Sequence, residues 1–245
     1  MNEYEAIFAR KSVRKYNGEL KLSEEELELI MDKLNGLTPL VDGIEVEFEI
    51  KPCKETNCKF NAQYCVVAYS QEKEHWKENV GYKPAQLDLF LPAINVGACW
   101  YGMGRVKEKY VNGKRYAIMY CFGKCGEQDF RSRKEEFTRK KTEEIWKGEF
   151  LGGVADAVRF APSACNSQPW RVVYEDGGTV KVYREKNTDN ILTRTLSRYF
   201  NGFDMGIFMY IFETVLKREG YEFSRKLYPE KDGNPVLAAE YTLKQ

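Results

Sequence analysis

Four cationic side chains lie within six residues near the start of the chain, and phosphate is a ligand that suits this pattern. Arg10 and Lys11 form one adjacent pair, Arg14 and Lys15 form another, and Ser12 adds a hydroxyl group between the pairs. Arginine presents a planar fork of N–H donors that matches pairs of phosphate oxygens. Taken alone, the same segment is also typical of a solvated basic turn, so the phosphate interpretation depends on the rest of the chain.

A loop bracketed by two prolines, residues 161–170, is the segment most suited to holding a planar heterocycle. It reads Ala-Pro-Ser-Ala-Cys-Asn-Ser-Gln-Pro-Trp and joins an expected helix to an expected strand. Proline fixes its own φ and pushes the preceding residue out of the helical region. The resulting stiff loop can aim backbone N–H, hydroxyl and amide groups at the edge of a ring. An ordinary proline-rich connection is the alternative.

Two further segments have weaker patterns. Residues 97–105, Gly-Ala-Cys-Trp-Tyr-Gly-Met-Gly-Arg, predict a glycine-rich turn where backbone can approach a flat ring. They lack the third glycine and the preceding strand of a dinucleotide-binding fingerprint. Residues 131–134, Arg-Ser-Arg-Lys, are similar to a second phosphate clamp, and a solvated helix start is about equally consistent with them.

Composition excludes several classes of function. Lys plus Arg total 38 and Asp plus Glu total 37, so the chain has no net attraction to nucleic acid or to an anionic membrane. No long apolar run or secretion signal is seen, and a cytoplasmic location is expected. The single histidine, His75, and the loosely spaced seven cysteines predict no metal site and no hydrolase triad. If the protein is an enzyme, a cofactor is expected to carry the chemistry.

The elements that position these segments indicate an α+β fold. Ser23 and Glu26 form a capping box before an apolar helical repeat, and Asp176-Gly177-Gly178 predicts a hairpin. Helices are expected at 2–9, 83–96, 131–147, 151–160 and 199–218, and strands at 44–50, 63–69, 116–122, 170–174, 180–183, 221–228 and 235–243. Two diverged halves are therefore expected, at 1–130 and 151–245, joined by a helical connector at 131–150.

Weak local similarity supports this division. Residues 8–11, Phe-Ala-Arg-Lys, are echoed by residues 137–140, Phe-Thr-Arg-Lys. Both halves also share the order helix, helix, strand, strand, long apolar helix, strand. A diverged duplication explains both observations, and two unrelated segments with a common element order are the alternative.

Taken together, these segments resemble the FMN-dependent nitroreductase family. Its pattern R-x-S-x-R/K-x-[YF] is matched by Arg10, Ser12, Arg14 and Tyr16, and its more specific pattern A-P-S-x-x-N-x-Q-P-W is matched in full by residues 161–170. The order is unusual, because in the family the second pattern follows the first within a few dozen residues. Here the corresponding place, residues 36–42, has lost the Ser, Asn and Gln, while the second half has lost the Ser of the first pattern.

The resemblance implies a nitroreductase-like fold in which the two halves form an intramolecular pseudo-dimer with one surviving composite FMN site. In the family, FMN lies at a two-fold dimer interface, so a fused duplication could keep one site and lose the other. The implied cofactor-binding residues are Arg10, Lys11, Ser12, Arg14, Cys99, Trp100, Tyr101, Gly102, Arg131, Arg133, Pro162, Ser163, Ala164, Asn166 and Gln168. The basic residues would hold the phosphate end, Arg14 would lie near the pyrimidine edge, and the proline-bracketed loop would hold the ring.

The activity implied by the resemblance is ping-pong hydride transfer from NAD(P)H through FMN to a nitro compound or quinone. No side-chain acid or base is required, so no catalytic residue is assigned. Dehalogenation, flavin breakdown, or flavin binding without turnover are the alternatives. A monomer is expected, with a homodimer as the second option, and the partners are small molecules rather than nucleic acid or membrane.

Overall fold

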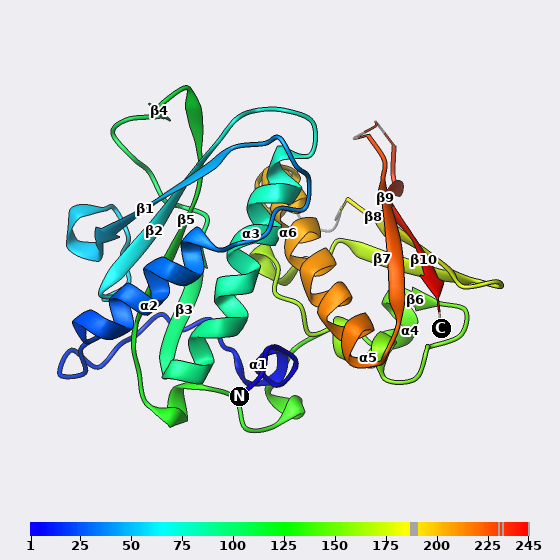
Figure 1. Ribbon diagram of the computed structural model, residues 1–245, viewed down its shortest axis with the longest axis horizontal. Coiled ribbons are helices and arrows are strands. Elements are labelled where there is room, and N and C mark those ends of the chain that lie inside the picture. Colours follow the sequence, from blue (N-terminus) through cyan, green and yellow to red (C-terminus); the bar gives the residue numbers. More distant parts are fainter. Residues whose placement is uncertain (187–190, 230, 232, 245) are drawn as a thin grey trace. The chain divides into compact units, whose positions relative to one another are not determined.

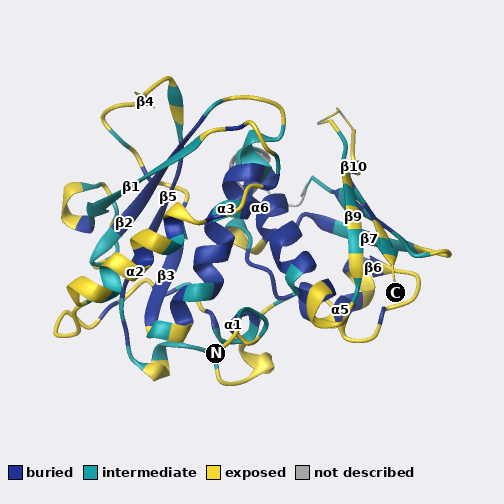
Figure 2. Cartoon of the chain, viewed as in Figure 1, coloured by how far each residue is buried: buried dark blue, intermediate teal, exposed yellow. Residues whose placement is uncertain are grey.

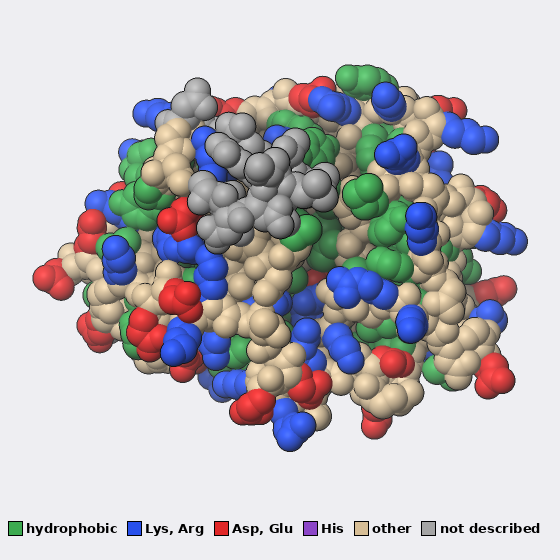
Figure 3. Space-filling view, turned by 180° about the vertical axis from the view of Figure 1, so that it is seen from behind, with side chains coloured by type: hydrophobic (Ala, Val, Ile, Leu, Met, Phe, Trp, Pro, Cys, Tyr) green, Lys and Arg blue, Asp and Glu red, His purple; other side chains and the backbone are tan. Residues whose placement is uncertain are grey.

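The computed structural model describes residues 1–186, 191–229, 231 and 233–244 (Figure 1). The chain divides into two compact units, residues 1–136 and 137–245, and each is described by itself. The division lies inside the segment where a connector was expected. Within the described residues, no helix is both long enough and apolar enough to cross a bilayer. Acidic and basic side chains are interspersed over the face shown in Figure 3.

The first unit is an antiparallel sheet with helices on one face. Its strands are ordered β1-β2-β5-β3, and β4 pairs with β5. The elements are α1 (Glu3–Ala9), α2 (Glu24–Asn35), β1 (Val46–Pro52), η1 (Cys53–Glu55), β2 (Tyr64–Ser70), α3 (Trp76–Phe90), η2 (Leu91–Ile94), β3 (Val96–Tyr101), β4 (Tyr110–Val111), β5 (Lys114–Lys124), η3 (Glu127–Asp129) and η4 (Lys134–Glu136).

Two clusters of buried side chains occupy the opposite faces of this sheet. On one face, Ile30 of α2 and Leu87 of α3 pack against Val66 and Phe122 of the strands, and Figure 1 shows both helices across this face. Most of α3 is buried (Figure 2). The other face buries Val67, Met119 and several cysteines. Because both faces of β2 and β5 are covered, these strands are continuous apolar runs rather than alternating ones.

The second unit repeats the strand order of the first. The strand order in its sheet is β6-β7-β8-β10-β9, and the part β7-β8-β10-β9 corresponds to β1-β2-β5-β3 in the first unit. In the chain, the hairpin of β7 and β8 is followed by a long helix and two further strands. The last of these strands pairs with the hairpin, as β5 does in the first unit. The elements are α4 (Thr142–Ile145), β6 (Trp146–Lys147), α5 (Val154–Val158), η5 (Ala164–Asn166), β7 (Trp170–Glu175), β8 (Thr179–Arg184), α6 (Ile191–Arg218), β9 (Glu222–Leu227) and β10 (Val236–Lys244).

A column of aromatic rings joins α6 to this second sheet. Trp170 of β7 stacks on Phe208 with ring centroids 4.9 Å apart, and Phe208 stacks on Phe212 at 5.9 Å. Phe212 then meets the edge of Tyr241 on β10 at 4.9 Å. Large buried rings contribute most of the apolar area in such a core, so these contacts hold the long helix on its sheet.

Most of the expected elements are confirmed. The capping box of α2 is present, with the Ser23 Oγ accepting from Glu26 N at 3.2 Å and Glu26 Oε2 accepting from Ser23 N at 3.0 Å. The hairpin of β7 and β8 turns at Gly177 and Gly178, both of which have positive φ. The α+β fold class is confirmed as well.

Three sequence expectations are wrong. Residues 97–101 belong to strand β3, because their backbone pairs with β5, and all of them but Trp100 are buried. The helix expected at 83–96 spans Trp76–Phe90 and gives way to the 3₁₀ turn η2, which contains Pro92. Residues 131–147 do not form one helix but the short helices η4 and α4 and the strand β6, whose backbone pairs in parallel with β7.

Candidate functional site

The basic segment at the start of the chain lies along strand β3. Val13 N donates to the carbonyl of Ala98 at 3.0 Å, and Ser12 forms an isolated bridge with the same residue. Gly97 permits this approach, because a Cβ there would lie 2.7 Å from Cγ2 of Val13. The hydroxyl of Tyr16 lies within hydrogen-bonding distance of the carbonyls of Val13 and Gly97. The structure therefore brings Ser12 next to Cys99.

Arg10 is buried and faces a carboxylate. Its Nε lies 2.9 Å from Oδ2 of Asp88 on α3, and the two side chains are 2% and 5% exposed. Asp88 also accepts a hydrogen bond from the hydroxyl of Tyr120 at 2.9 Å and one from Nε1 of Trp100 at 3.3 Å. Arg10 thus engages an internal anion with one edge of its guanidinium, while its Nη2 has no hydrogen-bond partner among the described residues.

Asp88 is a site residue that the sequence analysis missed. The only local signal is its position as a charged residue between Leu87 and Leu89 in a buried stretch of helix. A charge is seldom fully buried unless it is paired, so such a position indicates a distant cation. The sequence does not show which cation that is.

Arg131 lies directly against Arg10, although 121 positions separate them. Its backbone N donates to the carbonyl of Ala9 at 2.8 Å, and its Nη1 donates to the carbonyl of Arg10. Burial, and then the positive charge of Arg10, lower the pKa of Arg131 to about 10. Two residues assigned to the phosphate end by sequence are therefore neighbours, and their mutual repulsion makes an anion favourable beside them.

The turn after Arg131 already holds an anion that belongs to the chain itself. Oε1 of Glu136 accepts hydrogen bonds from Ser132 N at 2.9 Å, from Arg133 N at 3.0 Å and from Ser132 Oγ at 3.3 Å. These backbone hydrogen bonds lower the pKa of the Glu136 carboxyl below its ordinary value. Consecutive backbone N–H groups that converge on one oxygen form an anion-binding turn, and phosphate is a common occupant of such turns.

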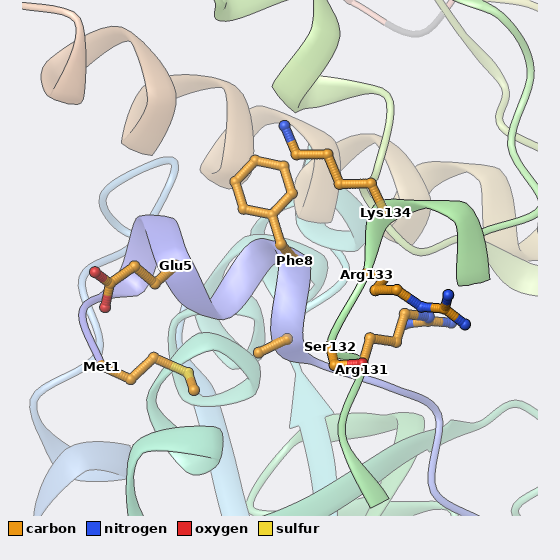
Figure 4. Close-up of a pocket in the computed structure, with 8 residues that line it drawn as sticks. Met1, Glu5, Phe8, Arg131, Ser132, Arg133 and Lys134 are labelled. Carbon is orange, nitrogen blue, oxygen red and sulfur yellow. The ribbon is translucent and has the colours of Figure 1, made fainter. Parts of the chain in front are cut away.

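A hollow of about 610 Å³ opens beside this turn (Figure 4). Figure 4 shows Arg131 and Arg133 extending to the same side, away from Met1 and Glu5, while the side chain of Lys134 extends beside the ring of Phe8. The Lys134 Nζ lies 4.6 Å from that ring centroid. The lining residues are Met1, Glu5, Phe8, Ala9, Arg131, Ser132, Arg133 and Lys134. The volume is within the range of small-molecule sites, and the basic residues on one side suit an anionic ligand.

The thiol of Cys99 lies in a positively charged environment. A hydrogen bond with Cys121, and then the charges of Arg14 and Arg10, lower the pKa of Cys99 although burial opposes this shift. Cys121 Sγ also donates to the carbonyl of Cys99 at 3.2 Å. Arg14 is exposed, so its guanidinium is accessible to a ligand near the start of β3.

The other residues predicted from 99–102 do not share one environment. Trp100 faces α3, where it donates to Asp88, whereas Tyr101 faces the opposite side of the sheet and packs against Phe60 at 5.1 Å. Gly102 and Lys11 are exposed. Successive residues of a strand point to opposite faces of the sheet. Cys99, Trp100 and Tyr101 therefore do not lie together on one face.

In the second unit, the proline-bracketed loop has an unusual backbone conformation. Cys165, Asn166 and Gln168 all have positive φ, at 52°, 55° and 47°, although none is glycine. Ser163 Oγ accepts from Gln168 N at 2.9 Å. Oδ1 of the buried Asp204 on α6 accepts from Ala164 N at 2.8 Å. Such conformations persist only where the surroundings hold them, and they are common at ligand sites.

The amide side chains of this loop bind the basic segment 138–140. Asn166 Nδ2 donates to the carbonyl of Thr138 at 2.8 Å, and its Oδ1 accepts from Nη1 of Arg139 at 2.6 Å. Gln168 Oε1 accepts from Lys140 N at 2.9 Å. The loop therefore holds the second Phe-x-Arg-Lys segment of the chain, a relationship that the sequence analysis did not predict. Pro162, Ser163 and Ala164, which are also predicted to bind the cofactor, precede Asn166 and Gln168 in this loop.

Comparison with known proteins indicates one family. A sequence model described as "Putative TM nitroreductase" matches residues 2–215. A search of curated proteins finds no match to this chain. Among solved structures, a Thermotoga maritima protein described as a "putative nitroreductase" is 21% identical, with a TM-score of 0.63, and the match covers 99% of this chain and 93% of that one. The shared fold extends over both units.

Two Clostridium difficile proteins match a smaller part of the chain. A nitroreductase family protein of strain 630 is 12% identical with a TM-score of 0.47, and the match covers 59% of this chain and 97% of that one. An FMN-dependent nitroreductase of strain R20291 is 17% identical with a TM-score of 0.40, and the match covers 49% of this chain and 86% of that one.

Proposed function

Because this chain belongs to the nitroreductase family, whose sequence model spans residues 2–215, we propose that it is an FMN-dependent oxidoreductase. It takes hydride from NAD(P)H and passes it to an electron-poor small molecule, such as a nitro compound or a quinone, in two separate half-reactions. One observation carries the proposal: Arg10 and Arg131, assigned to the phosphate end by sequence, are neighbours beside an anion-binding turn.

The residues of the first unit fit the phosphate of FMN. Nη2 of Arg10 is a buried donor without a hydrogen-bond partner among the described residues, and an anion at this place would complete its hydrogen bonding. Ser132 and Arg133 offer two backbone N–H groups that now bind Glu136. These two N–H groups would hold the FMN phosphate in place of the Glu136 carboxylate, and Arg131 and Arg133 would neutralise the phosphate charge.

Bound FMN would supply the redox chemistry, accepting hydride and passing it on. In the first unit, the exposed Arg14 would stabilise negative charge at the pyrimidine edge of the ring. In the second unit, Pro162, Ser163, Ala164, Asn166 and Gln168 are proposed as ring contacts because they match the family motif.

A fused duplication explains why one chain carries both parts of the site. The two units share one strand order, and each retains one of the two family motifs while the other has decayed. Both family motifs lie on one chain, so we propose that the protein functions as a monomer.

The test begins with release of any bound flavin from fresh protein and its identification by chromatography. Protein without flavin is then reconstituted with FMN, and binding is followed by quenching of flavin fluorescence. Arg131→Ala and Asn166→Ala lie in different units, and each is expected to weaken FMN binding at least tenfold. The exposed Arg115, which pairs with Glu72 at 2.6 Å, offers the control Arg115→Ala, which leaves binding unchanged.

The outcomes separate the proposed steps. Failure of the wild-type protein to bind FMN after reconstitution overturns the proposal. Loss of binding in Arg131→Ala but not in Asn166→Ala overturns the proposed role of the proline-bracketed loop and leaves a phosphate site in the first unit. If FMN binds but neither NADH nor NADPH reduces it, the protein is a flavin-binding protein without turnover and not an oxidoreductase.

A further inference from the structure

Three cysteine thiols converge on the face of the first sheet that α2 and α3 do not cover. The Sγ atoms of Cys53, Cys58 and Cys65 all lie within 4.8 Å of one another. Cys53 and Cys65 are buried and Cys58 is half-buried, and all three are free thiols. The flavin chemistry proposed above uses none of them. Their spacing in the chain, with four and then six residues between them, is not one of the usual zinc-binding patterns.

The loop that carries these cysteines is held in place by its own hydrogen bonds. Cys53 N donates to the carbonyl of Gln63 at 2.9 Å, which closes the loop at its base. Thr56 Oγ1 donates to the carbonyl of Cys53 at 2.8 Å and accepts from Cys58 N at 3.1 Å. Cys65 lies at the start of β2, with its backbone paired to Lys51 and Cys121. The three thiols are therefore positioned by backbone contacts and do not depend on a bound ion.

The spacing of the sulfur atoms is close to that of a thiolate metal site. Zinc binds thiolate at about 2.3 Å, so tetrahedral geometry places two ligand sulfurs about 3.8 Å apart. The sulfur atoms are at most 4.8 Å apart, so a movement of about half an ångström by each would reach this separation. The hydroxyl of Thr56 lies 3.6 Å from Cys65 Sγ, so an oxygen is close to one of the three sulfurs.

The surroundings also suit a soft cation. Apolar side chains pack around the thiols, among them Phe60 and Tyr101, whose rings are in edge contact with centroids 5.1 Å apart. Three thiolates would exceed the charge of one divalent ion, and the exposed Lys54 and Lys59 lie on the same loop, partly offset by Glu55. Thiolate-only ligand sets select zinc and other soft metals over magnesium or calcium.

We propose that Cys53, Cys58 and Cys65 bind one Zn²⁺ ion, with water or the Thr56 hydroxyl as the fourth ligand. The ion joins the loop to the start of β2 and is structural. Binding replaces three thiol protons by three Zn–S bonds, and the protons pass to solvent, so no change of oxidation state is involved. The site is independent of flavin binding.

The test uses the full-length protein, reduced and freed of metal under anaerobic conditions. Titration with Co²⁺ is expected to give a thiolate-to-cobalt charge-transfer band in the near ultraviolet that saturates at one ion per chain. One equivalent of Zn²⁺ then removes the band. Zn²⁺ is also expected to raise the Tm, and a thermal shift is measured on the same samples.

Cys58→Ser is the decisive variant, because Cys58 is half-buried and on a loop, and serine there leaves the fold intact. It is expected to weaken Co²⁺ binding at least tenfold and to lose the Zn²⁺-dependent thermal shift. The control is Cys165→Ser, since Cys165 is an exposed cysteine of the second unit, and both signals are retained in it. Circular dichroism of each variant without metal shows that its fold is intact.

The proposal is overturned if the wild-type protein shows no charge-transfer band, or if Cys58→Ser shows the same band as the wild type. It is also overturned if Cu⁺ binds where Zn²⁺ and Co²⁺ do not. A Cys53–Cys58 disulfide as the sole form after anaerobic isolation, seen by mass spectrometry of unreduced peptides, also excludes the zinc site. None of these outcomes depends on the presence of flavin.

Discussion

Nε of Arg10 lies 2.9 Å from Oδ2 of Asp88, and neither side chain is more than 5% exposed. Asp88 also accepts hydrogen bonds from Trp100 and Tyr120, so one carboxylate joins the N-terminal segment, α3, β3 and β5. A buried pair adds little net stability when it is complete, but removal of one partner leaves an uncompensated charge. The basic N-terminal segment is therefore held by a contact that does not tolerate loss of either partner.

Replacement of Asp88 by Asn is expected to lower the free energy of unfolding by about 3–5 kcal/mol, because the Arg10 charge then lies buried without its anion. Equilibrium unfolding in urea measures this change. The control is Glu72→Gln, which removes an exposed partner of Arg115 and should cost less than about 1 kcal/mol. Equal effects of the two substitutions would show that burial of the Arg10–Asp88 pair has no energetic consequence.

Replacement of Gly97 by Ala is expected to separate the N-terminal segment from β3. The new Cβ would lie 2.7 Å from Cγ2 of Val13 and 3.0 Å from Sγ of Cys125, so backbone or side chains must shift. Such overpacking costs about 1–3 kcal/mol. Thermal unfolding gives the change in stability, and Gly18→Ala is the matched control because a Cβ at Gly18 meets nothing within 4 Å. A Gly97→Ala protein as stable as this control contradicts the close approach.

Asp204 should make the protein less stable as the pH rises. Burial raises the pKa of its carboxyl to about 7, although hydrogen bonds from Ala164 and Ser167 oppose the shift. Between the ordinary value of 3.8 and about 7, the folded chain therefore binds a proton at this position that the unfolded chain has released. By linkage, the contribution of Asp204 is fully present below pH 3.8 and is lost between there and about pH 7, at about 1.4 kcal/mol for each pH unit.

The Asp204→Asn variant tests this, because the amide oxygen can still accept from Ala164 N while the titration is removed. Urea unfolding of both proteins at several pH values between 4 and 8 gives the difference in stability. The wild type should lose stability relative to Asp204→Asn as the pH rises, and Asp176→Asn, in the exposed hairpin turn, should follow the wild type. A constant difference over the whole range would exclude a raised pKa.

Glu136→Ala is expected to strengthen FMN binding several-fold, if the flavin site is as proposed. The carboxylate of Glu136 now occupies the backbone N–H groups of Ser132 and Arg133, and its charge opposes that of a phosphate. Fluorescence titration with FMN measures the effect, and Glu135→Ala serves as the control in the same segment. Weaker binding in Glu136→Ala would show that this carboxylate supports the site and does not compete for it.

Local patterns were enough to predict many elements and both motifs. The capping box of Ser23 and Glu26 and the hairpin at Gly177 follow from neighbouring residues, because caps and turns act over a few positions. The family resemblance was also contained in such short segments, and it is confirmed by the match over residues 2–215.

Other features were decided by contacts between distant residues. Residues 97–101 form a strand because β5 pairs with them, and residues 131–136 turn back because Glu136 captures their backbone N–H groups. Asp88 became the partner of Arg10, and the convergence of Cys53, Cys58 and Cys65 follows from the closure of a loop onto β2. Each of these contacts depends on which segments the fold brings together. A contact between residues that are far apart in the chain produces no periodic pattern in the sequence, so the sequence does not reveal it.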